Sequence, residues 1–129
     1  MKPNSVLFTM DAKGLFTNIL HKEGLKTMHD ALSKRTNPKV PTSFLVKLMT
    51  ILLYNNIFEF HDGYWRQDVG AAMGCKPVPD YANIFMAAFD QIIEELEGAE
   101  LLLLLLRFLD DYFSILWDPQ KNSMLCLQK

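Results

Sequence analysis

The chain has 129 residues, 50% of them hydrophobic and 22% charged, which predicts one folded domain and excludes a disordered or fibrous chain. The formal net charge of −2 lacks the basic excess that usually accompanies nucleic-acid binding. Cys75 and Cys126 have no metal-ligand spacing with each other or with the three histidines, so a zinc site is not expected and the histidines are read as ordinary residues.

Three observations bear on where the protein works. The residues before Asp11 do not form a signal peptide, and the run Leu101–Leu106 is far shorter than the ~20 residues that a membrane span requires. Two isolated thiols fit a reducing compartment better than a disulfide scaffold. We therefore expect an intracellular protein, in the nucleus or cytoplasm, with no membrane partner.

The first half of the chain predicts one strand and two helices. Ser5–Met10 is a short apolar strand, and residues 12–18 are a loop or tight turn. His21–Arg35 has helical spacing, and a second helix begins after a cap at Thr42 or Ser43. That second helix is expected to be well buried, because its apolar stripe is wide. The stripe comprises Phe44, Leu48, Ile51 and Leu52, widened by Leu45, Met49 and Leu53.

The middle of the chain predicts a hairpin and a third helix. In "IFEFHDGYWRQ", residues 57–67, two alternating strands flank a turn at Asp62-Gly63. A loop rich in glycine and proline follows, and Asp80 caps a helix over Tyr81–Glu97. The apolar face expected for this helix comprises Phe85, Ala88, Phe89, Ile92 and Leu96.

Two apolar strands are expected at Leu103–Leu109 and Tyr112–Trp117, with Asp110 and Asp111 between them. We expect the leucine run to be a buried strand, and we find no clear element in the tail after it. The order of elements predicts an α+β fold, with a mostly antiparallel sheet and helices packed on one of its faces.

The adjacent aspartates are the most informative feature, because an unpaired carboxylate is costly to bury. In a two-residue turn, Asp110 and Asp111 would stand at the rim of the sheet, and Asp11 ends the first strand. If these strands are neighbours, three acids converge and need a cation. Oxygen ligands suit Mg²⁺ or Mn²⁺, and two ions about 3.5–4 Å apart can drive phosphoryl transfer. The alternative is a solvated turn and an ordinary strand end.

Three ordered segments then carry a family resemblance: "FTMDAKGLFTNI", "GYWRQDVGAAMGCKPVPDYANIFM" and "RFLDDYFSILW". They resemble motifs A, B and C of the reverse-transcriptase palm, and are most similar to the Penelope-like retroelement branch. The motifs cover about residues 6–19, 67–86 and 107–117. The resemblance implies that residues 1–129 are a single palm-domain fragment, with the antiparallel sheet of a polymerase palm and without fingers, thumb or endonuclease domain.

The resemblance also implies roles for single residues. Asp11 and Asp110 would be catalytic metal ligands for two Mg²⁺ or Mn²⁺ ions, and Asp111 would be the weaker third acid. Phe16 would be the aromatic gate that clashes with a 2′-hydroxyl and so selects deoxynucleotides, and Leu109 would pack under the primer end. The remaining substrate-binding positions would be Gln67, Gly70, Ala71, Met73 and Gly74. Asn83 would either help to fix that loop or be an ordinary surface residue of the helix.

The implied function is RNA-directed DNA polymerisation for a retroelement. A primer 3′-hydroxyl attacks the α-phosphate of a deoxynucleoside triphosphate, with RNA as template and DNA as primer. Ala71, Cys75 and Val78 depart from the residues usual for the family. Two alternatives stay open: an inactive remnant or a nucleic-acid- or protein-binding module of the same fold, and an unrelated α+β interaction protein.

Overall fold

The computed structural model describes residues 4–96 and 101–118, and the chain divides into two compact units. The first unit comprises Met1–Ala12 with Gln91–Lys129, and the second comprises Lys13–Asp90. The first motif is therefore divided after Ala12. Its aspartate belongs to one unit and its aromatic residue to the other.

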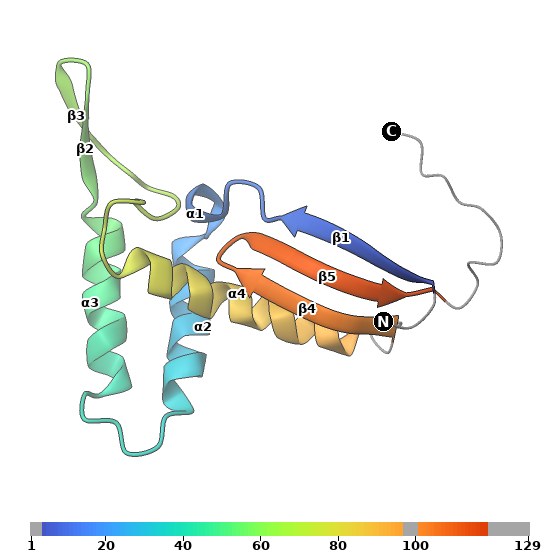
Figure 1. Ribbon diagram of the computed structural model, residues 1–129. Coiled ribbons are helices and arrows are strands. Elements are labelled where there is room, and N and C mark those ends of the chain that lie inside the picture. The colour runs from blue at the N-terminus through green and yellow to red at the C-terminus, as the bar shows by residue number, and fades with distance from the viewer. Residues whose placement is uncertain (1–3, 97–100, 119–129) are drawn as a thin grey trace. The chain divides into compact units, whose positions relative to one another are not determined.

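The first unit contains a three-stranded antiparallel sheet. Its strands are β1 (Ser5–Asp11), β4 (Leu102–Phe108) and β5 (Asp111–Trp117). The order in the sheet is β1-β5-β4, so β5 pairs with a strand on each side (Figure 1). Because β4 and β5 form a hairpin and β1 is antiparallel to β5, the β4–β5 turn lies beside the C-terminal end of β1.

The β4–β5 turn differs by one residue from the prediction. Its two central residues are Leu109 and Asp110, while Asp111 is already the first residue of β5 and pairs with Phe108. The prediction that both aspartates occupy the turn was therefore wrong. Leu109 has φ 55°, a left-handed conformation that costs a non-glycine residue roughly 1–2 kcal/mol. No sequence rule places a leucine there, because this position of a tight hairpin normally favours glycine.

The leucine run is a strand, but the prediction of its burial was wrong. Leu103, Leu104 and Leu106 are exposed, and the buried side chains of this sheet include Tyr112 and Ser114 on β5. The reason is positional, since β4 is an edge strand while β5 is central. An apolar sequence predicts that this segment is a strand. The position of the strand in the sheet decides how many of its side chains are buried.

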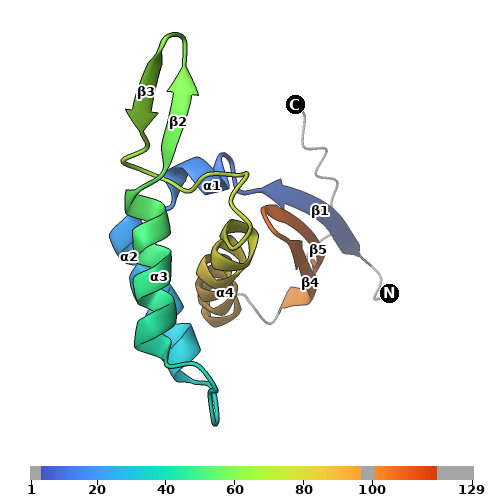
Figure 2. The ribbon, with the colours of Figure 1, turned by 90° about the vertical axis from the view of Figure 1, so that its left-hand side faces the viewer.

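The second unit is mainly helical, with one two-stranded hairpin (Figure 2). Helices α2 and α3 run antiparallel and pack together, and β2 and β3 form the hairpin that follows α3. Helix α4 begins in this unit. The elements are α1 (Leu15–Asn18), α2 (His21–Ser33), α3 (Thr42–Tyr54), β2 (Ile57–Phe60), β3 (Gly63–Arg66) and α4 (Val78–Glu95).

Two local predictions in the first half of this unit were wrong at element ends. The expected loop before His21 contains the short helix α1. Neither Thr42 nor Ser43 caps α3, because the cap position is Pro41. The Thr42 hydroxyl instead donates to the Leu32 carbonyl at 3.1 Å, and this bond joins the end of α2 to the start of α3.

The hairpin is confirmed, but its turn is at His61 and Asp62, with Gly63 already paired to Phe60. Asp80 does not cap the third helix, because α4 begins at Val78 and Asp80 lies in its first turn. The expected end at Glu97 lies outside the described residues.

The predicted burial of the helices was also wrong in part. On α3, Met49 and Leu53 are buried, whereas the stripe formed by Phe44, Leu48, Ile51 and Leu52 is exposed. On α4 the buried residues are Val78, Tyr81, Ala82 and Met86, while Phe89 and Ile92 are exposed, as is Leu96 just after the helix. Both helices are apolar around more than one face, so periodicity alone could not identify the covered side. The mixed α+β class with antiparallel sheets is confirmed.

Candidate functional site

The three aspartates lie together at one end of the sheet in the first unit. Asp11 is the register partner of Asp111, so β1 and β5 place the two residues directly opposite each other. Beyond the strand, the Ala12 N–H donates to the Asp110 carbonyl oxygen at 2.8 Å. This bond joins the β4–β5 turn to the end of β1, the neighbouring strand ends visible in Figure 1.

Without a bound cation, the three carboxylates of this group repel one another. Like charges directly opposite each other in a sheet are destabilising, by roughly 0.2–1 kcal/mol. Asp11 and Asp111 are exposed and Asp110 is half-buried. In the described part of the chain, none of the three forms a salt bridge with a basic side chain. The strand ends and the turn therefore hold three carboxylates together without a basic partner among the described residues.

The donor chemistry of the group fits a hard cation, because all the side-chain donors are carboxylate oxygens. The side-chain geometry is less favourable. Over residues 4–96 and 101–118, no three His, Cys, Asp or Glu side chains are placed to hold a metal ion. The backbone brings the aspartates together, and the side chains are not gathered into a ligand shell.

An arginine supports the turn from within β4. The Arg107 Nη1–H group donates to the Leu109 carbonyl at 3.1 Å, across the strained residue of the turn. Sequence reasoning missed this residue, although a single cation in a seven-residue apolar strand, one position before the "FLDD" segment, was a usable signal.

Beside the acids, the sheet has an open hollow of about 400 Å³. Its lining is mostly apolar or aromatic, with Asp111 at the acidic end of the sheet. The lining residues are Thr9, Leu106, Arg107, Phe108, Asp111, Tyr112 and Phe113. An organic group next to the carboxylates could be accommodated there.

In the second unit, the structure brings Phe16 together with Gly70 and Ala71. The Ala71 N–H donates to the Phe16 carbonyl at 2.6 Å. Gly70 has φ 80°, and a Cβ at this position would lie 2.6 Å from the Phe16 carbonyl oxygen and 2.7 Å from Thr17 Cα. Only glycine permits this approach. The predicted gate residue and the predicted glycine loop are therefore in direct backbone contact.

The other predicted substrate-binding residues do not join this contact. The Gln67 side chain accepts a hydrogen bond from Asn56 Nδ2 at 2.6 Å and donates one to the Val69 carbonyl at 2.9 Å. Met73 is 70% exposed, and no atom lies within 4 Å of a Cβ built at Gly74. Asn83 is exposed on α4.

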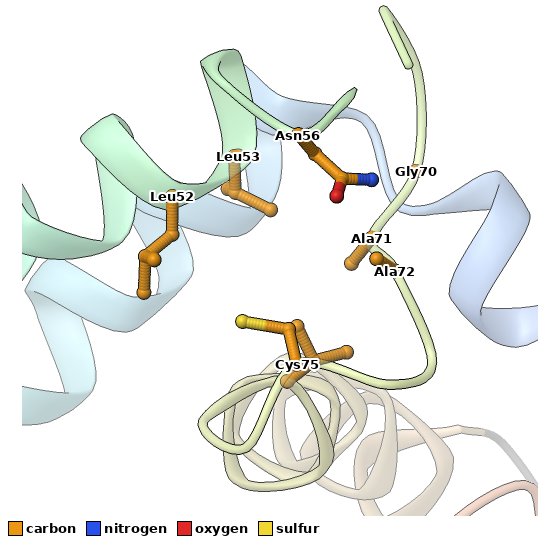
Figure 3. Close-up of a pocket in the computed structure, with 8 residues that line it drawn as sticks. Leu52, Leu53, Asn56, Gly70, Ala71, Ala72 and Cys75 are labelled. Atoms are coloured by element: carbon orange, nitrogen blue, oxygen red, sulfur yellow. The ribbon is translucent and has the colours of Figure 1, made fainter. Parts of the chain in front are cut away.

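A small cavity lies under the same loop (Figure 3). Its volume of about 20 Å³ is enough for one water molecule. Cys75, a position that departs from the family pattern, contributes its thiol to the lining. The lining comprises Leu52, Leu53, Asn56, Gly70, Ala71, Ala72, Cys75 and Val78.

Comparison with known proteins finds a structural similarity at low sequence identity. No protein-family model matches the chain, and no curated protein matches its sequence. Among solved structures, the chain is similar to apo telomerase from Candida tropicalis truncated from its C-terminal domain, with a TM-score of 0.68 and 13% identity. The match covers 89% of this chain and only 24% of the telomerase chain. At 13% identity this likeness supports the fold alone, an α+β fold similar to that of the matched part of the telomerase chain.

No α-helix of residues 4–96 or 101–118 combines the length and hydropathy needed to cross a bilayer.

Proposed function

We propose that this chain is the palm of a reverse transcriptase of the Penelope-like kind, which extends a DNA primer on an RNA template. The observation that carries the proposal is the direct pairing of Asp11 with Asp111, and the bond from Ala12 to Asp110. Residues from opposite ends of the sequence gather three acids at one end of a sheet. The distant likeness to telomerase supports the fold, and the branch rests on the sequence motifs.

In the proposed reaction, Asp11 and Asp110 hold two Mg²⁺ or Mn²⁺ ions, with Asp111 as the third acid. The ions would activate the primer 3′-hydroxyl and stabilise the leaving oxygen. The side chains of these aspartates must rotate to form the ligand set. The mutual repulsion of the acids without metal gives a physical reason for a cation to bind there.

The second unit is proposed to bind the incoming deoxynucleoside triphosphate. Phe16 supplies the ring that rejects a 2′-hydroxyl, and Gly70 and Ala71 supply a backbone that a substrate can approach closely. The backbone contact between Phe16 and this loop supports the assignment. Gln67, Met73 and Gly74 stay in the proposal as residues that contact the nucleotide or template after the loop adjusts.

The decisive experiment is primer extension on an RNA template with Mg²⁺ by the polypeptide that contains this chain. Asp11→Asn and Asp110→Asn should each reduce incorporation at least 10³-fold, because each removes a charged metal ligand at the reacting phosphate. Asp62→Asn, in the exposed hairpin turn, is the matched control and should retain activity. Undiminished synthesis by Asp110→Asn would overturn the assignment.

One observation favours a second candidate, a non-catalytic nucleic-acid-binding module of the same fold. No three acidic or metal-binding side chains among the described residues are placed to hold a metal ion. If this candidate is correct, wild-type protein and Asp110→Asn should bind a primer–template duplex equally, and neither should extend it.

A further inference from the structure

His21 contacts the proposed nucleotide-binding loop, although nothing in the proposed function uses it. It begins α2 and is only 6% exposed. Its Nε2 lies 2.7 Å from the carbonyl oxygen of Gly70, 49 residues further along the chain. A carbonyl oxygen can only accept a hydrogen bond, so Nε2 carries the proton and donates it.

The bond from His21 and the bond from Phe16 act on the same peptide group. The Gly70 carbonyl accepts from His21, and the Ala71 N–H of that peptide donates to the Phe16 carbonyl at 2.6 Å. A peptide group is planar, so bonds at both of its ends fix its orientation. These two bonds form a peptide clamp that joins the loop to residues 16 and 21 of the preceding segment.

The clamp acts where the backbone is least restrained. Gly70 has φ 80°, and glycine reaches conformations on both sides of φ zero at little cost. No side chain at this position limits rotation of the following peptide. A rotated peptide would lose both hydrogen bonds and leave a buried carbonyl unpaired, at a cost comparable to a lost hydrogen bond. The clamp therefore selects one orientation of the loop.

The surroundings of the imidazole show that the bond to Gly70 is its specific polar role. The ring packs edge-on against Tyr54, with centroids 4.9 Å apart at 74°. Its Nδ1 is buried and makes no hydrogen bond within the described part of the chain. An unpaired buried nitrogen is a cost that an aliphatic side chain would avoid.

We propose that His21 is a positioning residue that fixes the Gly70–Ala71 peptide against Phe16 and thereby sets discrimination between deoxyribose and ribose substrates. The second step rests on the proposed function, because it requires Phe16 to contact the sugar. His21 itself does not touch the nucleotide. Its contribution is the fixed spacing between the Phe16 backbone and the glycine loop.

The clamp is tested first by amide hydrogen exchange at Ala71. His21→Leu should accelerate this exchange roughly tenfold, the effect of one buried hydrogen bond, and His21→Gln, which retains a donor, should restore part of the protection. The matched control is His29→Leu, an exposed histidine on the same helix, which should leave Ala71 unchanged. Unchanged exchange in His21→Leu would overturn the clamp.

If His21→Leu fails to fold, the wild-type protein decides the same point. Nitrogen NMR should show His21 with its proton on Nε2, and a neutral ring protonated only on Nδ1 would overturn the clamp. This measurement needs neither activity nor a variant.

Selectivity is tested by primer extension with matched deoxy- and ribonucleotides. His21→Leu should lower the ratio of kcat/KM for the deoxynucleotide over the ribonucleotide about tenfold, mainly through KM, and His29→Leu should preserve the ratio. A merely structural loss would lower both rates and keep the ratio. Faster Ala71 exchange with an unchanged ratio would overturn the selectivity step.

If the wild type transfers no nucleotide, the proposed function fails, and the selectivity step fails with it. The amide exchange of Ala71 still decides whether the clamp exists.

Discussion

At the residue scale, burial between the helices of the second unit changes the pKa of one tyrosine. Tyr81 is 2% exposed, and its hydroxyl has no hydrogen-bond partner in the described part of the chain. Burial raises the pKa of Tyr81 to about 12, with smaller contributions from Tyr54 and Glu23. The folded state therefore keeps the Tyr81 proton at a pH where the unfolded chain has released it.

This pKa predicts a loss of stability at alkaline pH. Between pH 10 and 12 the unfolded state binds fewer protons at Tyr81 than the folded state does, so the free energy of unfolding falls as pH rises. Tyr81→Phe should flatten this fall, and it should not destabilise the protein at pH 7, because it removes an unpaired buried hydroxyl. Urea unfolding at pH 7, 10 and 11 measures both effects.

The control for this prediction is Tyr64→Phe, because Tyr64 is 80% exposed. It should unfold with the same pH dependence as the wild type. An equally steep alkaline loss in Tyr81→Phe would show that another group is responsible.

At the element scale, the Tyr81 side chain of α4 reaches Gly24 of α2 and occupies the space that a side chain there would need. A Cβ at Gly24 in α2 would overlap the Tyr81 hydroxyl and lie 2.7 Å from Ile19 Cγ2. A glycine within a helix lowers stability by roughly 0.5–1 kcal/mol relative to alanine. Gly24 is nevertheless required, because a side chain at this position would overlap Tyr81.

Gly24→Ala should therefore destabilise the protein by about 1–3 kcal/mol, the usual effect of overpacking, despite the better helix propensity of alanine. Gly74→Ala is the matched control, since no atom lies within 4 Å of a Cβ at Gly74. Thermal or urea unfolding of the two variants measures the difference. A Gly24→Ala variant as stable as the wild type would mean that the Tyr81 side chain can move away from Gly24 without cost.

For the whole molecule, the acidic end of the sheet predicts a dependence of global stability on divalent cations. A ligand that binds only the folded state raises the free energy of unfolding by RT ln(1 + [L]/Kd). Mg²⁺ or Mn²⁺ should therefore raise the melting temperature of the wild type. Asp11→Asn should abolish this increase, while raising stability without metal by roughly 0.2–1 kcal/mol through relief of the Asp11–Asp111 repulsion.

The control is Asp62→Asn, which should respond to Mg²⁺ as the wild type does. A metal-induced increase of the same size in Asp11→Asn would show that the cation binds elsewhere. NaCl at matched ionic strength is a second control for general screening of charge, and it should not reproduce the increase.

The sequence by itself predicted the order and type of most elements, because strand alternation, helical spacing and hairpin residues are local signals. It also singled out Asp11, Asp110 and Asp111, since two adjacent charges in an apolar run are costly without a role. The motif resemblance added Phe16 and Gly70. The distant telomerase likeness supports the fold that these signals predicted.

Only the tertiary structure decided which faces of the helices and strands are buried. Leu106 and Ile51 were predicted to be buried and are exposed. It also decided the turn, where a left-handed Leu109 leaves Asp110 in the bend and pairs Asp111 with Asp11. The bond from His21 to Gly70 joins residues 49 positions apart. Such contacts depend on how elements meet, and no local pattern encodes that, because burial and long-range hydrogen bonds belong to pairs of segments.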